Sequence, residues 1–226
     1  MKVKFLFIFI LASILLSGCS EKTDVQEDST SGAVWDSVSS AENNVEYIDV
    51  SADWPAYTNV SALIKEANVV VVGKVTGISF QMLDTQTACP PTEISNLKDC
   101  LLYTIYDVEV LTSYKGTSSG TIKIRLMGGL KDIYLNEQLA ALASFDESTI
   151  PVVAGMPKME IGETYLLVLY QYEDTMPTPV NPGQGMYKLD DPLQKDTYSY
   201  VSPKEIISYF GEDKWTAFIS EENAAE

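Results

Sequence analysis

Few kinds of side chain in this chain could carry out chemistry, because its 226 residues include three cysteines and no histidine. The lack of histidine excludes Ser-His-Asp and Cys-His catalysis, imidazole-ligated zinc and the usual general base near neutral pH. No phosphate-binding loop or EF-hand pattern is present, so the sequence predicts no cofactor and no metal site. The most informative residues are therefore Cys19, Cys89 and Cys100.

Cys19 follows a segment that is typical of export signals. The first four residues, MKVK, carry two positive charges, and the apolar run FLFIFILASILL comes next. This run is shorter than the roughly 20 residues that cross a bilayer, which favours a signal peptide over a membrane span. The tetrapeptide LSGC that ends at Cys19 resembles the bacterial lipobox, and the resemblance implies removal of residues 1–18 and acylation of Cys19, with palmitate or a similar chain. The alternative is a plain signal peptide that happens to contain a cysteine.

The stretch after Cys19 predicts a flexible tether. Residues 19–45 are rich in Ser, Asp, Glu and Asn, and their apolar residues follow no period. Residues 46–226 are then expected to form one domain. We expect this domain to lie on the extracytoplasmic face of the cell membrane, with the lipid bilayer as a partner through the acylated Cys19.

Cys89 and Cys100 enclose a polar stretch that contains proline. Outside the cytoplasm such a pair is expected to form a disulfide bond. Two free thiols or a metal-binding pair are the alternatives, but a soft-metal site would have too few ligands here.

The charge balance argues against nucleic acid as a partner. The chain has 32 acidic and 15 basic residues, a formal net charge of −17. Binding to nucleic acid depends on positive charge that faces phosphates. The acidity is expected mainly to keep the domain soluble.

The hydrophobic periodicity predicts five strands and three helices. Ser202, Pro203 and Glu205 have the spacing of a capping box at the start of the last helix. Gly73 and Gly77 predict a bulge in the first strand. The predicted strands are 69–80, 101–116, 121–127, 164–172 and 186–189, and the predicted helices are 59–68, 135–145 and 202–210.

The segments ANVVVVGKV, YTIYDVEVLTSYKG, KIRLMGG and IGETYLLVLY resemble the netrin-like variant of the OB barrel, the class that includes tissue inhibitors of metalloproteinases. They are also similar to lipoproteins of Gram-positive bacteria built on the same pattern. The resemblance, over about 69–189, implies a mainly β, five-stranded OB-like barrel with a helix between strands three and four and flanking short helices. An eight-stranded meander or a small sandwich is the alternative. The inhibitors chelate the zinc of their target through an N-terminal cysteine just before the barrel. Cys19 lies far from the first strand, so the resemblance does not imply inhibition by zinc chelation.

Tyrosines suggest a binding surface. In β proteins tyrosine mostly packs in the half-buried layer, but aromatic rings with few charges also form interfaces. The candidates are Tyr103, Tyr106, Tyr172 and Tyr187, together with the long loops 84–101 and 173–185. We expect a binding module with a protein or glycan partner in the cell envelope, and not an enzyme. A carboxylate-based hydrolase of envelope glycans and a structural envelope protein without a dedicated ligand are the alternatives.

Overall fold

The second of two units of the chain contains every residue that the structure describes. The units are residues 1–42 and 43–226. The computed structural model describes residues 45–92, 97–116, 119–143, 145, 148–189, 201–211, 213, 214 and 217. Cys19, the predicted signal peptide and the predicted tether up to residue 44 lie outside these ranges. Within them, no helix is both long and apolar enough to cross a membrane.

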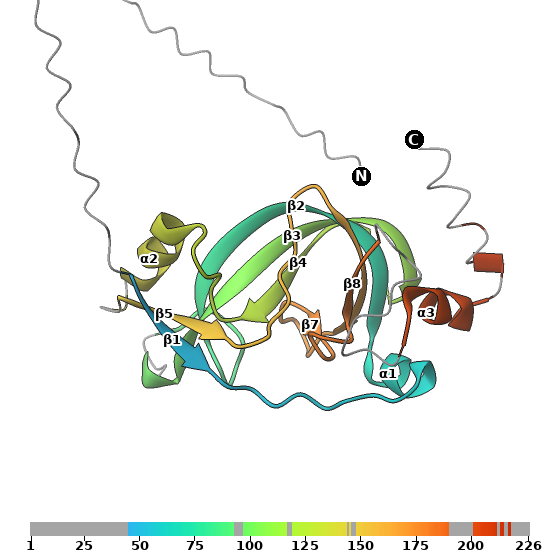
Figure 1. Ribbon diagram of the computed structural model, residues 1–226, viewed down its shortest axis with the longest axis horizontal. Coiled ribbons are helices and arrows are strands. Elements are labelled where there is room, and N and C mark those ends of the chain that lie inside the picture. Colours follow the sequence, from blue (N-terminus) through green and yellow to red (C-terminus); the bar gives the residue numbers. More distant parts are fainter. Residues whose placement is uncertain are drawn as a thin grey trace, which may run out of the picture. The chain divides into compact units, whose positions relative to one another are not determined.

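A curled antiparallel sheet forms the body of the domain (Figure 1). Its order is β4-β3-β2-β6-β7, and β8 also pairs with β6. The prediction of a mainly β fold is therefore confirmed, and the five predicted strands correspond to β2, β3, β4, β6 and β8. The bounds are β2 Val69–Asp84, β3 Cys100–Lys115, β4 Gly120–Met127, β6 Thr164–Tyr170, β7 Thr178–Pro179 and β8 Met186–Lys188.

Glycines allow the long strand β2 to bend. The register with β3 shifts between Val72 and Gly73 and again between Val75 and Gly77, which confirms the predicted bulge. A β-carbon at Gly73 would collide with the side chain of Val108 and approach the Glu109 carbonyl oxygen to 2.9 Å. Bulges increase the twist of a strand and bend it. The sheet can therefore curl around its own apolar face.

A second, two-stranded parallel sheet was not predicted from the sequence. It consists of β1 (Glu46–Val50) and β5 (Thr149–Val153). Pro151 in β5 has no N–H, and proline is disfavoured inside a sheet. Its carbonyl accepts a bond of 2.7 Å from Gly129 N–H, so its backbone faces away from β1 and no bond of the β1–β5 ladder is lost.

Within the described ranges, three α-helices pack on the sheets: α1 (Val60–Glu66), α2 (Leu135–Ala143) and α3 (Pro203–Tyr209). A short 3-10 helix, η1 (Leu97–Asp99), precedes β3. The predicted capping box is confirmed at α3, where the Ser202 side chain accepts from Glu205 N–H and the Glu205 carboxylate accepts from Ser202 N–H. The helix expected between the third and fourth predicted strands is α2. It is followed by the extra strand β5 before β6 begins.

The core lies on both faces of the sheet because side chains alternate along a strand. Val70 and Val72 of β2 pack with α1, α3 and β6. Val71 and Val75, on the opposite face, join apolar side chains of β3, β4 and β6. Farther along β2, the cluster around Met82 packs against α2 and β5.

Candidate functional site

The four predicted binding tyrosines do not form one surface. Tyr106 is fully buried, and Tyr103 and Tyr187 are nearly so, whereas Tyr172 is 55% exposed. The prediction of a tyrosine binding surface is therefore wrong for three of the four residues. The physical reason is strand alternation: Tyr106 shares a face of β3 with the buried Val108 and packs in the same cluster.

The buried tyrosines use their hydroxyl groups to bond the backbone. The Tyr106 hydroxyl accepts from Met159 N–H at 3.4 Å, and the Tyr187 hydroxyl donates to the Gln184 carbonyl at 2.8 Å. Burial raises the pKa of Tyr106 to about 12, partly offset by the bond from Met159. These contacts stabilise the core and leave no ring face for a ligand.

The predicted binding loop 173–185 is hydrogen-bonded to another segment of the domain and does not project as a free loop. It contains β7, and the Asn181 side chain donates to the Pro55 carbonyl at 2.9 Å. The Gln184 side chain accepts from Tyr57 N–H and donates to the Tyr57 carbonyl, at 2.8 and 2.7 Å. This loop therefore fixes the segment that connects β1 to α1. Of the other predicted loop, 84–101, residues 93–96 lie outside the described ranges.

Cys89 and Cys100 both lie next to Asp84, and no bond joins their sulfur atoms. Asp84 is the ladder partner of Cys100, and its N–H donates to the Cys89 carbonyl at 3.0 Å. Burial raises the pKa of the Cys100 thiol, and the carboxylates of Asp84 and Asp99 raise it further. The Cys89–Cys100 disulfide stays a prediction. It is supported by the backbone contacts of Asp84 with both residues.

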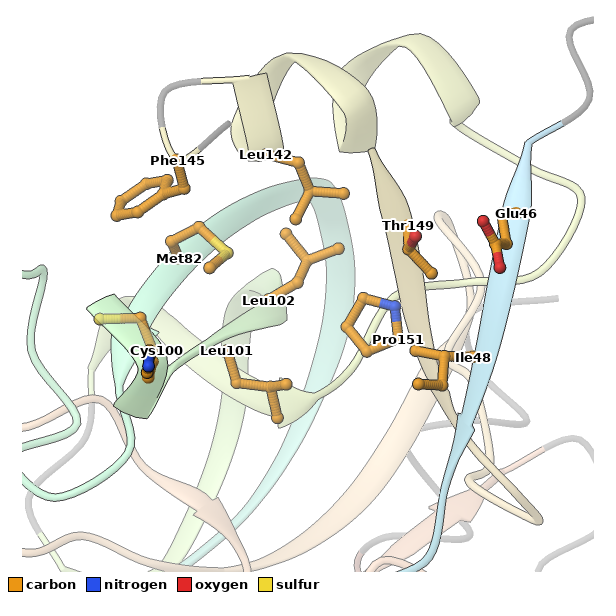
Figure 2. Close-up of a pocket in the computed structure, with 11 residues that line it drawn as sticks. Glu46, Ile48, Met82, Cys100, Leu101, Leu102, Leu142, Phe145, Thr149 and Pro151 are labelled. Carbon is orange, nitrogen blue, oxygen red and sulfur yellow. The ribbon is translucent and has the colours of Figure 1, made fainter. Parts of the chain in front are cut away.

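An apolar pocket of about 440 Å³ lies beside Cys100 (Figure 2). Side chains from six elements line it, and most are apolar. On one side these are Ile48 of β1 and Pro151 of β5, and on the other Leu101 and Leu102 of β3. Met82 of β2, Leu142 of α2 and the nearby Phe145 complete the apolar lining.

The register of β1 and β5 decides which of their side chains reach the pocket. Ile48 lies opposite Pro151, and Glu46 lies opposite Thr149, so these four residues share one face of the small sheet. All four line the pocket. Ile150, on the other face of β5, is fully buried in the core cluster with Leu142. The pocket therefore borders this core cluster, whose Met82, Leu102 and Leu142 also line it.

Gln138 holds α2, and with it Leu142, in place. Its buried side chain accepts from Leu130 N–H at 2.9 Å and donates to the carbonyls of Leu130 and Ile133 at 2.8 and 2.7 Å. A β-carbon at Gly129 would collide with this side chain. The segment before α2 is therefore fixed to the helix by one glutamine.

Charged groups of both signs lie among the pocket-lining residues. Glu46 comes from β1, and Lys98 comes from η1 just before β3. Among the residues that the structure describes, no group of three or more Cys, Asp or Glu side chains could hold a metal ion. The arrangement of the pocket is one that binds apolar groups and orients them through a few polar contacts.

Comparisons with known proteins give no relative from which a role could be taken. No protein-family model matches the chain, and no curated protein is significantly similar to it. A function for the chain is therefore inferred from the pocket and its lining.

Sequence reasoning missed the pocket because its residues come from segments far apart in the chain. Ile48 stands in a short segment, EYIDV, for which no strand was predicted. The adjacent Leu101 and Leu102 were a usable signal, since two neighbouring apolar residues in a strand point to opposite faces and both need a partner. Only the β2–β3 register, in which Leu101 lies opposite Leu83 and Leu102 opposite Met82, shows which face of the sheet each leucine takes.

Proposed function

We propose that this protein is a lipid-anchored, extracytoplasmic binding module whose ligand site is the pocket between β1, β5, β3 and α2. The curled sheet is interpreted as an OB-like barrel of the netrin type, joined to a small sheet that builds the pocket. The single observation that carries the proposal is the pocket itself, about 440 Å³ in volume and lined mainly by apolar side chains.

The size and exposure of this pocket support a binding role. Ligand pockets typically measure about 300–1,000 Å³ and combine an apolar lining with a few polar groups. Ile48, which lines the pocket, is 55% exposed. Ile48 is therefore continuous with the other apolar side chains of the pocket, and contiguous exposed apolar surface marks binding sites.

Binding of a neutral apolar dye tests the pocket. Nile red is expected to bind the domain with increased fluorescence. Ile48→Asp places a charge in the lining and is expected to weaken binding roughly tenfold or more, since each factor of ten corresponds to about 1.4 kcal/mol. Ile161→Asp is the matched control, because Ile161 is 51% exposed and does not line the pocket.

Equal dye binding by the two aspartate variants would contradict the pocket as the ligand site. Thermal unfolding of both variants shows whether each is folded at the temperature of the binding measurement.

The anchor is proposed from the sequence, where Cys19 ends a lipobox-like tetrapeptide. Two or more acyl chains give stable membrane attachment, whereas one chain gives only marginal binding. Cys19→Ala is expected to move the protein from the membrane fraction to the soluble fraction. Retention of this variant on membranes at high salt would show that the anchor is not the acylated cysteine.

A further inference from the structure

The outer edge of β1 has backbone groups that no described strand pairs with. β1 is an end strand of its two-stranded sheet, and among the described residues only β5 pairs with it. Ala154 N–H donates to the Val50 carbonyl at 3.3 Å, so the backbone of Val50 faces β5. Because this direction alternates along a strand, Tyr47 and Asp49 direct their N–H and C=O groups to the open edge. Such an edge is a template for another extended chain.

The open edge and the pocket belong to the same strand. Ile48, between Tyr47 and Asp49, lines the pocket with its side chain (Figure 2). Peptides that add a strand to a sheet edge gain affinity from main-chain hydrogen bonds and specificity from pockets that take alternate side chains. β1 offers both features within five residues, Glu46–Val50.

β1 itself carries two acids and no basic residue, which favours a basic partner. The nearby cations are Lys98 at the pocket and Lys131, whose Nζ lies 5.8 Å from the centroid of the Tyr47 ring. Glu46 and Asp49 are both exposed acids of β1, on a chain with 32 acidic and 15 basic residues. A second copy of the chain would add the same two acids to this edge, and like charges in directly opposite positions destabilise a strand pair. Lys or Arg side chains that flank the bound strand would instead face opposite charge.

We propose that the β1 edge binds an extended peptide segment of a partner protein, in which an aliphatic side chain enters the pocket and flanking basic residues face Glu46 and Asp49. This inference rests on the proposed function and specifies the ligand of the same site. A free acyl chain would fill the pocket but would leave the N–H and C=O groups of Tyr47 and Asp49 without partners. A peptide strand satisfies both the pocket and the edge.

The test uses a fluorescent synthetic peptide of alternating lysine and leucine with blocked ends, and measures its binding by anisotropy. Asp49→Asn removes only the charge. Asp49→Pro removes the charge and the outward N–H, while the β1–β5 ladder is kept, because proline is tolerated where an edge strand faces solvent. Asp174→Asn, an exposed acid in the loop after β6, is the control for general charge.

Three results are expected if the inference is correct. Asp49→Pro weakens peptide binding at least several-fold more than Asp49→Asn does, and Asp174→Asn has little effect. The same peptide with its backbone nitrogens methylated at alternate positions binds much more weakly to the unchanged protein. A peptide with glutamate in place of lysine does not bind.

Equal binding by Asp49→Pro and Asp49→Asn, together with no effect of backbone methylation, would overturn the inference. So would displacement of Nile red by an aliphatic amphiphile when the lysine-leucine peptide does not displace the dye, because the ligand would then be an acyl chain. In both cases the proposed function stands as long as Nile red binds the unchanged protein and Ile48→Asp weakens that binding. Failure of the dye to bind at the pocket would count against the proposed function itself.

Discussion

Arg125 of β4 is joined to Pro177, just before β7, by a backbone hydrogen bond of 3.0 Å from the Arg125 N–H to the Pro177 carbonyl. These residues lie at opposite ends of the strand order β4-β3-β2-β6-β7. The Arg125 side chain adds a second link, since its Nε donates to the Met176 carbonyl at 2.9 Å. Its guanidinium also lies 5.8 Å from the ring centroid of Tyr103. Arg125 therefore links the two ends of the curled sheet. This contact between β4 and the residues before β7 is called the seam.

Arg125→Met is expected to lower the free energy of unfolding by about 1–3 kcal/mol. It removes a charged hydrogen bond and a cation–π contact, but it keeps the apolar stem and the backbone bond. Lys123→Met on the same strand is the control, because Lys123 makes an exposed ion pair with Asp107 at 2.7 Å. Exposed pairs contribute about 0–1 kcal/mol. Denaturant unfolding measures both, and equal effects would show that the seam is not stabilised by Arg125.

Gln138→Leu is expected to lower the free energy of unfolding by roughly 2–4 kcal/mol. The variant leaves the Leu130 N–H and the carbonyls of Leu130 and Ile133 without their partner, and unsatisfied buried groups cost about 1–3 kcal/mol each. Glu137→Gln, at an exposed position of the same helix, is expected to change stability little. Thermal unfolding compares the two. If Gln138→Leu is as stable as the unchanged protein, the glutamine does not hold α2 in place.

Stability is expected to fall between pH 10 and pH 12 because burial raises the pKa of Tyr106 from 10 to about 12. The folded state keeps the proton in a range where the unfolded state has lost it. The stability that depends on the protonated Tyr106 is therefore fully present below pH 10. It is lost as the pH rises through 12, by roughly 2–3 kcal/mol in all. Burial also raises the pKa of Tyr103 and Tyr165, with the same sign.

The alkaline loss of stability can be assigned with two phenylalanine variants. Tyr106→Phe is expected to show a smaller decline, since no proton is held at that position. Tyr172→Phe, which changes an exposed tyrosine, serves as the control. Unfolding followed by circular dichroism and by tyrosinate absorbance gives the comparison. The same decline in both variants would show that Tyr106 is not the group responsible.

The two domain cysteines are expected to react at different rates when reduced. Cys89 is exposed, whereas Cys100 is partly buried, and burial with the nearby Asp84 and Asp99 raises the pKa of Cys100. Since the thiolate is the reactive form, Cys100 requires a higher pH for the same rate of alkylation. Alkylation of Cys19→Ala protein over a range of pH, followed by peptide mass spectrometry, measures both rates. Equal rates at every pH would contradict this assignment.

Oxidation of the same variant tests the predicted disulfide. A mass lower by two hydrogens, and protection of both thiols from alkylation, are expected under mild oxidation. Closing this loop would stabilise the folded state by up to about 3 kcal/mol. Persistence of two reactive thiols would show that the backbone at Asp84 keeps the sulfur atoms apart.

Much of the fold follows from local sequence signals. The alternation in TIKIRLM places Ile124 and Leu126 in the core, and the capping spacing of Ser202 and Glu205 starts α3 as predicted. The glycines of β2 mark the positions where its register shifts. These features depend on interactions within a few residues, so periodicity, capping and turn chemistry reveal them.

The small sheet and the burial of the tyrosines depend on distant partners. β1 carries two acids in five residues and pairs with β5, about a hundred residues away, so its own sequence gives little strand signal. Tyrosine suits both a core and an interface, and only the strand register puts Tyr106 inside and Tyr172 outside.

The sequence by itself determined the export signal pattern, the acidic character, the lack of histidine and the mainly β order of elements. Only the tertiary structure decided that Ile48, Leu102, Leu142 and Pro151 meet in one pocket, and that β5 is the one described strand that pairs with β1 beside it. The reason is physical: composition and periodicity record how each residue relates to its chain neighbours. A binding site is made by packing between segments that the chain brings together only on folding.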